Sequence, residues 1–156
     1  MQKITPFLWF NNNAEEAVNF YTSIFKESKL GNMTRYDKAG AQVSGMAEGT
    51  VMTVSFQLNG QDFTAINGGP HFKFTEAISF VINCKDQEEI DHYWNKLTEG
   101  ADPRSQQCGW LKDKYGLSWQ VVPAELPQLL KKTPKVMEEV LKMKKIDVNR
   151  LKEVAG

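Results

Sequence analysis

Tryptophan side chains are the residues of this chain most suited to binding a small molecule. Trp9 and Trp110 fall in segments rich in strand-forming residues, and an aromatic side chain on the open face of a sheet would form the apolar wall of a ligand pocket. Core packing explains both residues equally well, and it is the preferred interpretation of Trp119. Arg35, on another strand-like stretch, would pair with an anionic ligand group or form a salt bridge at the sheet rim. These residues indicate binding and identify no catalytic group.

Acid–base and nucleophilic groups are few. His71 follows Gly-Gly-Pro in a loop, where an imidazole would serve as a general base or a stray metal ligand, or would simply be solvated. Cys108 has no neighbouring base or predicted helix N-terminus to activate its thiol, so we interpret it as inert. Paired glutamates occupy the first turns of two predicted helices, where the helix dipole favours negative charge: Glu15, Glu16, Glu88 and Glu89. We therefore assign no catalytic residue.

The charge balance and the cysteine content narrow the possible functions. Lys plus Arg and Asp plus Glu number 19 each, so the chain lacks the positive field that binds nucleic acid or anionic membranes. The sequence shows no run of about 20 apolar residues and no secretory leader. Two cysteines are too few for a disulfide framework or a structural zinc site. We expect a cytoplasmic protein that forms one domain over residues 1–156.

An internal repeat sets the expected architecture. At an offset of 73 residues, the segment 7–24 aligns with the segment 80–97, and the alignment pairs Tyr21 with Trp94. Each segment reads as a strand, a polar turn and a helix with one apolar face. The sequence therefore predicts two copies of one supersecondary unit.

A predicted hairpin follows each helix. In the first copy, two strands flank Asn59-Gly60, a pair that supplies the positive φ angles of a type I′ turn. Aligning the turn glycines of the two hairpins sets Thr64 against Gln120. Between the copies, Asn67–Pro70 contains Gly-Gly-Pro and predicts a linker. We expect an α+β fold of two tandem βαβββ modules, at about residues 3–68 and 75–123, followed by a Lys-rich helical extension at 124–156.

Three segments together resemble a known family. They are TPFLWFNNNAEEAVNFYTSIF (Thr5–Phe25), LNGQDFTAINGG (Leu58–Gly69) and GWLKDKYGLSWQVVP (Gly109–Pro123). The chain resembles the PhnB-like family, commonly labelled 3-demethylubiquinone 3-methyltransferase, of the vicinal-oxygen-chelate superfamily that includes glyoxalases and bleomycin-resistance proteins. The resemblance implies two βαβββ modules whose curled mixed sheets form an open cup, usually completed in a homodimer.

The resemblance also implies where a metal would bind. Metal-using members place His, Glu or Gln ligands at four strand positions that face the cup. Carried onto this chain, these positions fall near Pro6 and on Thr64, Ser79 and Gln120. Proline offers no side-chain ligand, hydroxyls are poor ligands, and one neutral amide would not hold a transition ion. We predict that this metal site is absent and that the protein uses no cofactor.

Metal-free binding of a small organic molecule is therefore the predicted function. We expect seven side chains to line the cup: Trp9, Arg35, Thr64, His71, Ser79, Trp110 and Gln120. A metal-dependent lyase, isomerase or dioxygenase is the alternative from the superfamily, and the family label suggests a methyltransferase. A Rossmann-type adenosyl site would need a Gly-rich loop between a strand and a helix, which the sequence lacks. A dimeric scaffold without a ligand is a further alternative.

Overall fold

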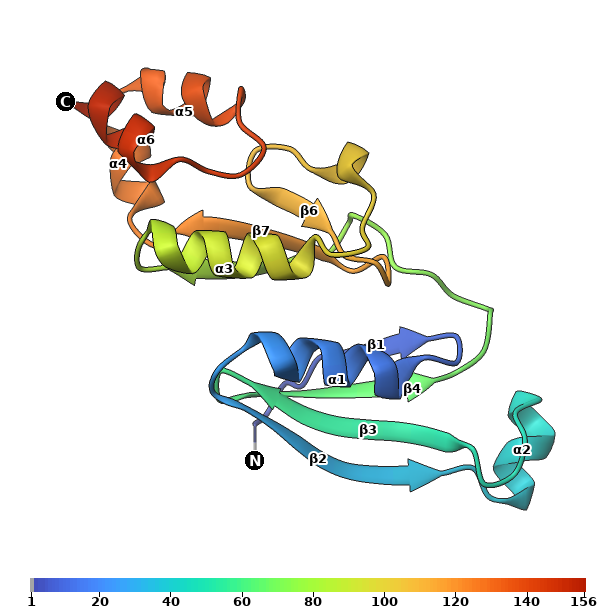
Figure 1. Ribbon diagram of the computed structural model, residues 1–156. Helices are drawn as coiled ribbons and strands as arrows, with labels where there is room; N and C mark the ends of the chain where they lie inside the picture. The colour runs from blue at the N-terminus through green and yellow to red at the C-terminus, as the bar shows by residue number, and fades with distance from the viewer. Residues whose placement is uncertain (1) are drawn as a thin grey trace. The chain divides into compact units, whose positions relative to one another are not determined.

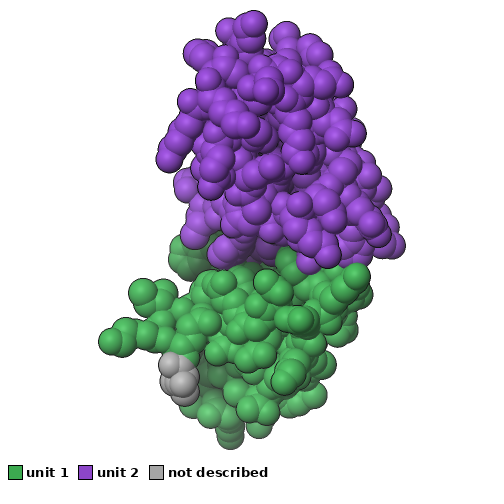
Figure 2. Space-filling view, turned by 90° about the vertical axis from the view of Figure 1, so that its left-hand side faces the viewer, with its two compact units in different colours: residues 1–73 green, residues 74–156 purple. Residues whose placement is uncertain are grey.

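The computed structural model describes residues 2–156 and divides the chain into two compact units (Figures 1 and 2). The first unit ends at Lys73, and the second runs from Phe74 to Gly156. Each unit is built on its own mixed β-sheet, and further helices follow at the C-terminus. The predicted α+β class is confirmed. None of the helices in the described chain is long and apolar enough to span a membrane.

The first unit contains a four-stranded sheet in the order β1-β4-β3-β2 (Figure 1). β1 runs parallel to β4, and the other neighbouring strands are antiparallel. Its elements are β1 (Phe7–Phe10), α1 (Ala14–Ile24), β2 (Ser28–Arg35), α2 (Lys38–Ser44), β3 (Val51–Leu58) and β4 (Gln61–Asn67).

Helix α1 covers one face of this sheet. Its apolar residues recur at helical spacing, so that Ala17, Tyr21 and Ile24 are all buried against the strands. β1, β3 and β4 alternate buried and partly exposed residues, and Phe56 of β3 stacks on Tyr21 with ring centroids 6.5 Å apart. The side chains between the buried positions therefore point to the face of the sheet opposite α1.

The predicted hairpin turn between β3 and β4 is confirmed. Asn59 and Gly60 have φ angles of 51° and 78°, as a type I′ turn requires. The turn fixes the register of β3 against β4, in which Ser55 lies opposite Thr64.

Asn67 has a different role from the linker residue that the sequence suggested. It is the last residue of β4, and its side chain is buried. Its Oδ1 accepts a hydrogen bond of 2.8 Å from Ala14 N and so caps α1, whereas Asn13, the residue before the helix, makes no side-chain cap bond. Its Nδ2 donates to Glu15 Oε1 at 2.6 Å and to the Val51 carbonyl at 3.0 Å. The end of β4 thereby fixes the start of α1.

The second unit has a three-stranded sheet in the order β5-β7-β6. Its elements are β5 (Phe80–Cys84), α3 (Gln87–Leu97), the 3-10 turn η1 (Pro103–Ser105), β6 (Trp110–Lys112) and β7 (Ser118–Pro123). Asp86 caps α3, because its Oδ1 accepts a hydrogen bond of 2.9 Å from Glu89 N.

The expected fourth strand of the second module is replaced by a turn. Pro103 has no backbone N–H to donate to a neighbouring strand, and it begins the 3-10 turn η1 instead. The side chain of Asp102 caps this turn. In this stretch of the described chain, the only strand-like pairing is an isolated bridge between Gln107 and Trp110. The second sheet is consequently one strand narrower than the first.

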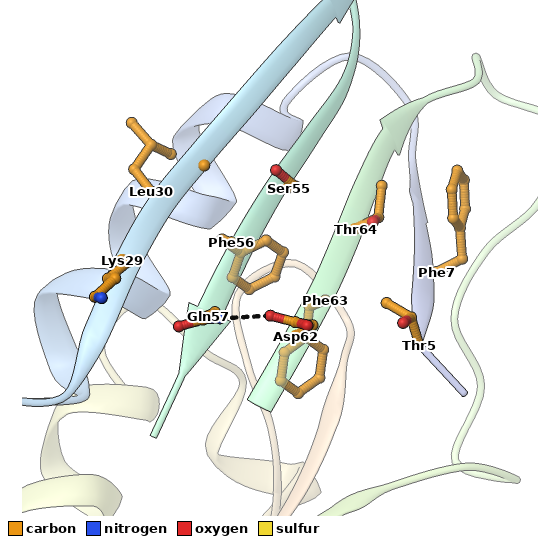
Figure 3. A pocket seen from close by; sticks show the side chains of 11 residues that line it. Thr5, Phe7, Lys29, Leu30, Ser55, Phe56, Gln57, Asp62, Phe63 and Thr64 are labelled. Atoms are coloured by element: carbon orange, nitrogen blue, oxygen red, sulfur yellow. Dashed lines mark hydrogen bonds between the residues drawn. The ribbon is translucent and has the colours of Figure 1, made fainter. Parts of the chain in front are cut away.

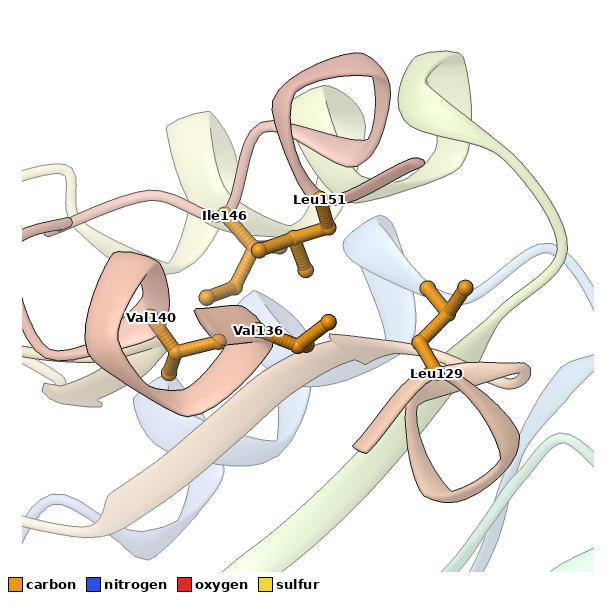
Figure 4. Close-up of a cluster of buried hydrophobic side chains, with 5 residues drawn as sticks. All are labelled: Leu129, Val136, Val140, Ile146 and Leu151. Carbon is orange, nitrogen blue, oxygen red and sulfur yellow. The ribbon is translucent and has the colours of Figure 1, made fainter. Parts of the chain in front are cut away.

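The C-terminal extension folds into three short helices. These are α4 (Leu126–Lys132), α5 (Pro134–Val140) and α6 (Val148–Ala155). All three lie within the helical extension expected at residues 124–156. The helices bury a hydrophobic cluster of their own (Figure 4), formed by Leu129, Val136, Val140, Ile146 and Leu151.

Candidate functional site

A hollow of about 520 Å³ lies on the first unit (Figure 3). Its volume falls in the range of small-molecule pockets. It is lined by residues that precede β1 or belong to β1, β2, β3 and β4: Thr5, Phe7, Lys29, Leu30, Gly31, Ser55, Phe56, Gln57, Asp62, Phe63 and Thr64.

Strand register brings the central side chains of the hollow together. Thr64 lies beside Phe7 on one neighbouring strand and beside Ser55 on the other. In the adjacent row, Gln57 lies opposite Asp62 and donates a 2.6 Å hydrogen bond from Nε2 to Oδ1 (Figure 3). The hollow therefore has a hydroxyl-bearing centre between a paired amide–carboxylate group and an aromatic ring.

Ser55 is committed to the sheet itself. The register of β2 against β3 shifts between Leu30 and Met33, and the Ser55 hydroxyl fills this bulge by accepting 2.8 Å from Asn32 N. A Cβ on Gly31 would collide with Ser55 Oγ, so the close approach requires glycine there. Thr5 and Thr64, in contrast, use their hydroxyls for no hydrogen bond within residues 2–156. These two hydroxyls are the groups best placed to bind a ligand.

Apolar side chains stand beside the hydroxyls. Phe7 is 59% exposed and Leu30 is 50% exposed, and both line the same hollow. Their location on the rim of a hollow, together with the two free threonine hydroxyls, gives a mixed apolar and hydrogen-bonding surface.

Three of the predicted site residues of the first unit lie outside the hollow. Trp9 donates from Nε1 to the Gly69 carbonyl at 3.0 Å, and its ring meets Phe72 edge-on with centroids 4.9 Å apart. Arg35 donates from Nη1 to the Gly49 carbonyl at 3.0 Å. His71 is exposed and lies between Gly69 and Phe72, the two residues that Trp9 contacts.

Thr64 is the predicted site residue that does line the hollow. Phe7, Leu30 and Thr5 were not singled out from the sequence as ligand-binding residues. Their exposure depends on strand pairing, which periodicity alone does not reveal.

The predicted site residues of the second unit gather on one face of its sheet. Gln120 donates from Nε2 to Ser79 Oγ at 3.0 Å, and Trp110 lies directly opposite Gln120 in the antiparallel pair. Trp119 points to the other face, is buried, and donates from Nε1 to Asp113 Oδ2 at 2.9 Å. The prediction that Trp119 is a core residue is confirmed.

The registers also show that Pro6 and Ser79 are not counterparts in the two units. Phe7 lies opposite Thr64, but it is Val81, not Phe80, that lies opposite Gln120. The turn before α1 has three residues (11–13) and the turn before α3 has two (85–86), so the strands repeat at one residue more than the helices. The counterpart of Ser79 is therefore Thr5, one residue before Pro6.

The corrected donor set does not fit a transition metal. Thr5 and Thr64 in the first unit, and Ser79 and Gln120 in the second, offer only neutral oxygen or nitrogen atoms. Within the described residues, no group of three or more His, Cys, Asp or Glu side chains could hold an ion.

Cys84 does not supply a reactive nucleophile either. Its side chain is fully buried on the α3 side of β5. Burial raises the pKa of this thiol to about 12, and the nearby carboxylates of Glu89 and Asp86 act in the same direction. Cys84 is a core residue.

Comparison with known proteins identifies the family. The sequence model of the 3-demethylubiquinone-9 3-methyltransferase family matches residues 2–122. The PhnB protein from Bacillus cereus is 43% identical with a TM-score of 0.65, and the match covers 78% of this chain and 99% of that protein. No curated protein matches the chain.

Two more distant structures share the fold. A protein from Pseudomonas aeruginosa is 20% identical with a TM-score of 0.60, over 79% of this chain and 98% of that one. The fosfomycin resistance protein FosX from Listeria monocytogenes, solved with Mn(II) and a dihydroxypropylphosphonic acid, is 19% identical with a TM-score of 0.51, over 83% and 99% of the two chains. The match over residues 2–122, together with the 43% identity to the PhnB protein, shows that the chain belongs to the PhnB-like 3-demethylubiquinone-9 3-methyltransferase family.

Proposed function

We propose that this protein binds a small organic molecule in the hollow of its first sheet, without a divalent metal. The observation that carries the proposal is a pocket of about 520 Å³ in which an exposed aromatic ring stands beside the unengaged hydroxyl of Thr64. The ligand would have an aromatic or aliphatic body for Phe7 and Leu30, and at least one hydrogen-bonding oxygen for Thr5 or Thr64.

The expected affinity is modest. Covering the exposed part of the Phe7 ring would contribute about 1–2 kcal/mol, and each hydrogen bond to a threonine hydroxyl about 0.5–1.5 kcal/mol. Loss of translational freedom opposes these terms. Together the favourable terms reach at most about 5 kcal/mol, so we expect dissociation constants no tighter than about 0.2 mM.

The methyltransferase activity in the family name has less support from the chain. The connection between β1 and α1 is Asn11-Asn12-Asn13, which contains no glycine for a close approach to a nucleotide. S-adenosylmethionine nevertheless belongs in any ligand panel, because binding of this molecule would favour that activity. The homodimer that the family resemblance implies is likewise part of the proposal.

Thermal-shift measurements on metal-depleted protein would test the proposal. The panel contains small aromatic and anionic compounds, each with and without added Mn(II), Zn(II) or Ni(II). We expect at least one compound to raise the melting temperature equally in the presence and absence of metal.

Matched variants locate the binding. Phe7→Ala should weaken it at least about fivefold, equivalent to about 1 kcal/mol, whereas Val43→Ala should leave it unchanged. Val43 is 92% exposed on α2 and lies outside the hollow. A metal requirement for every ligand, or equal losses in the two variants, would refute the proposal.

A further inference from the structure

The second sheet has no strand at the place where β2 lies in the first sheet. In the first unit, Thr53 and Val54 of β3 lie against β2. In the second unit β6 is the outer strand, and the residues before it contribute the isolated bridge between Gln107 and Trp110. Backbone groups along such an edge need partners from water or from another segment.

Strand register shows which residues occupy the unpaired positions. Trp110, opposite Gln120, holds the place in its hairpin that Ser55 holds in the first unit. Counting back from Trp110, Gly109 corresponds to Val54 and Cys108 corresponds to Thr53.

The C-terminal extension supplies partners for both of these residues. Cys108 N donates to the Met143 carbonyl and Gly109 N donates to the Lys144 carbonyl, each at 2.8 Å. Cys108 and Gly109 have φ angles of 55° and 83°, which are not strand angles. The extension therefore replaces the hydrogen bonds of the missing strand without forming a regular ladder.

The extension also packs tightly against Gly109, where there is no room for a side chain. A Cβ on Gly109 would lie 3.1 Å from Ile146 Cγ1 and 3.1 Å from the Val121 carbonyl oxygen. Ile146 is fully buried and belongs to the cluster inside the three C-terminal helices (Figure 4). One side chain thus joins the core of the extension to the end of the sheet.

Helix α3 holds the same segment from the other side. Gln87 donates from Nε2 to the Ile146 carbonyl at 3.0 Å and accepts from Val148 N at 2.9 Å. Lys145 forms an ion pair with Asp91 at 3.1 Å. Side-chain hydrogen bonds to two backbone groups fix the chain direction, which a hydrophobic contact alone does not.

We propose that residues 143–148 form a clamp that completes the second unit in place of its missing strand and positions β6. Trp110 follows the clamped residues directly, so the clamp also sets the position of the face that carries Trp110 and Gln120. The clamp lies outside residues 2–122, the part of the chain that the family model matches.

Amide hydrogen exchange on the full chain tests the clamp. In the unaltered protein, the amides of Cys108 and Gly109 should be protected to the same degree as those of β7. Ile146→Ala should accelerate their exchange at least tenfold and speed up the labelling of the partly exposed Cys108 by thiol reagents, while the amides of the β3–β4 hairpin stay unchanged. Leu141→Ala is the matched control, because this side chain lies two residues before the clamp and is 58% exposed, so its loss should change neither readout.

A second variant covers the case in which Ile146→Ala unfolds the whole chain. Gln87→Ala removes the two hydrogen bonds to the clamp and leaves the hydrophobic cluster intact, so it should accelerate the same two amides. Unprotected Cys108 and Gly109 amides in the unaltered protein would overturn the proposal. So would a variant that opens α5 and α6 without affecting residues 107–111.

Discussion

Asn67 and Asp113 are buried polar side chains that hold one turn in each unit. Asp113 accepts hydrogen bonds from the backbone amides of Tyr115 and Leu117 and from the Trp119 indole. Asn67 uses its amide oxygen and its amide nitrogen within the fold. Buried polar atoms of this kind are satisfied internally, and they contrast with the open hydroxyls of the hollow. This contrast separates side chains that hold the fold from those offered to a ligand.

Replacing Asn67 tests the first of these roles. Asn67→Asp removes both donors of the amide and brings a second carboxylate against Glu15, so we expect a loss of about 2–4 kcal/mol in the free energy of unfolding. Urea denaturation measures the loss. Asn12→Asp, at an exposed position in the turn before α1, should change stability by less than about 0.5 kcal/mol, and an equal effect of the two variants would contradict the role of Asn67.

The two thiols should react very differently. Because burial raises the pKa of Cys84 to about 12, this side chain stays a neutral, inaccessible thiol at pH 8. We expect a thiol reagent to label one cysteine in the folded protein, Cys108, and both cysteines after denaturation. Cys108→Ser should abolish labelling of the folded form, and rapid labelling of Cys84 would contradict its burial.

At the level of elements, the sequence predicted the helices and turns that are determined by residues close together in the chain. Helices α1 and α3 follow from apolar spacing, and the hairpin turn follows from Asn59-Gly60. Features set by distant contacts were missed. Asn67 looked like a linker residue because the backbone groups that it binds are 16 and 53 positions away.

The candidate site was predicted only partly for a related reason. The repeat of 73 residues holds for the helices, but a turn longer by one residue shifts β1 against β5, so the helix offset paired Pro6 with Ser79 although the strand registers pair Ser79 with Thr5. A one-residue shift moves a strand side chain to the opposite face. Thr64 was identified correctly as facing the hollow because the hairpin turn fixes its register directly.

Acid should loosen the C-terminal helices. Hydrogen bonds from Arg150 and then Lys142 hold the pKa of Glu139 below the usual glutamate value of 4.5. The charged form is favoured by folding, so its contribution is complete above pH 4.5 and is lost as the pH falls through the lowered pKa. Amide exchange in α5 and α6 should accelerate in that range. Glu139→Gln should remove the dependence, whereas Glu138→Gln, at an exposed neighbour, should preserve it.

At the level of the whole molecule, the chain consists of two units that each bury their own core. The boundary falls between Lys73 and Phe74, and the residues around it are mostly exposed (Figure 2). Backbone that is exposed and outside a sheet is the preferred substrate of proteases. We expect brief trypsin treatment to cut first after Lys73. A first cut inside a sheet, or at the lysines of the C-terminal helices, would contradict this division of the chain.

Metal-free binding in the hollow is tested most directly by mapping where a ligand touches the protein. NMR spectra of the metal-depleted protein would be followed during titration with a compound that raises its melting temperature. The largest shift changes should fall on the backbone amides of Thr5, Phe7, Leu30 and Thr64 and should be the same with and without added Zn(II). Changes that appear only when the ion is present, or that fall outside the hollow, would contradict the proposed function.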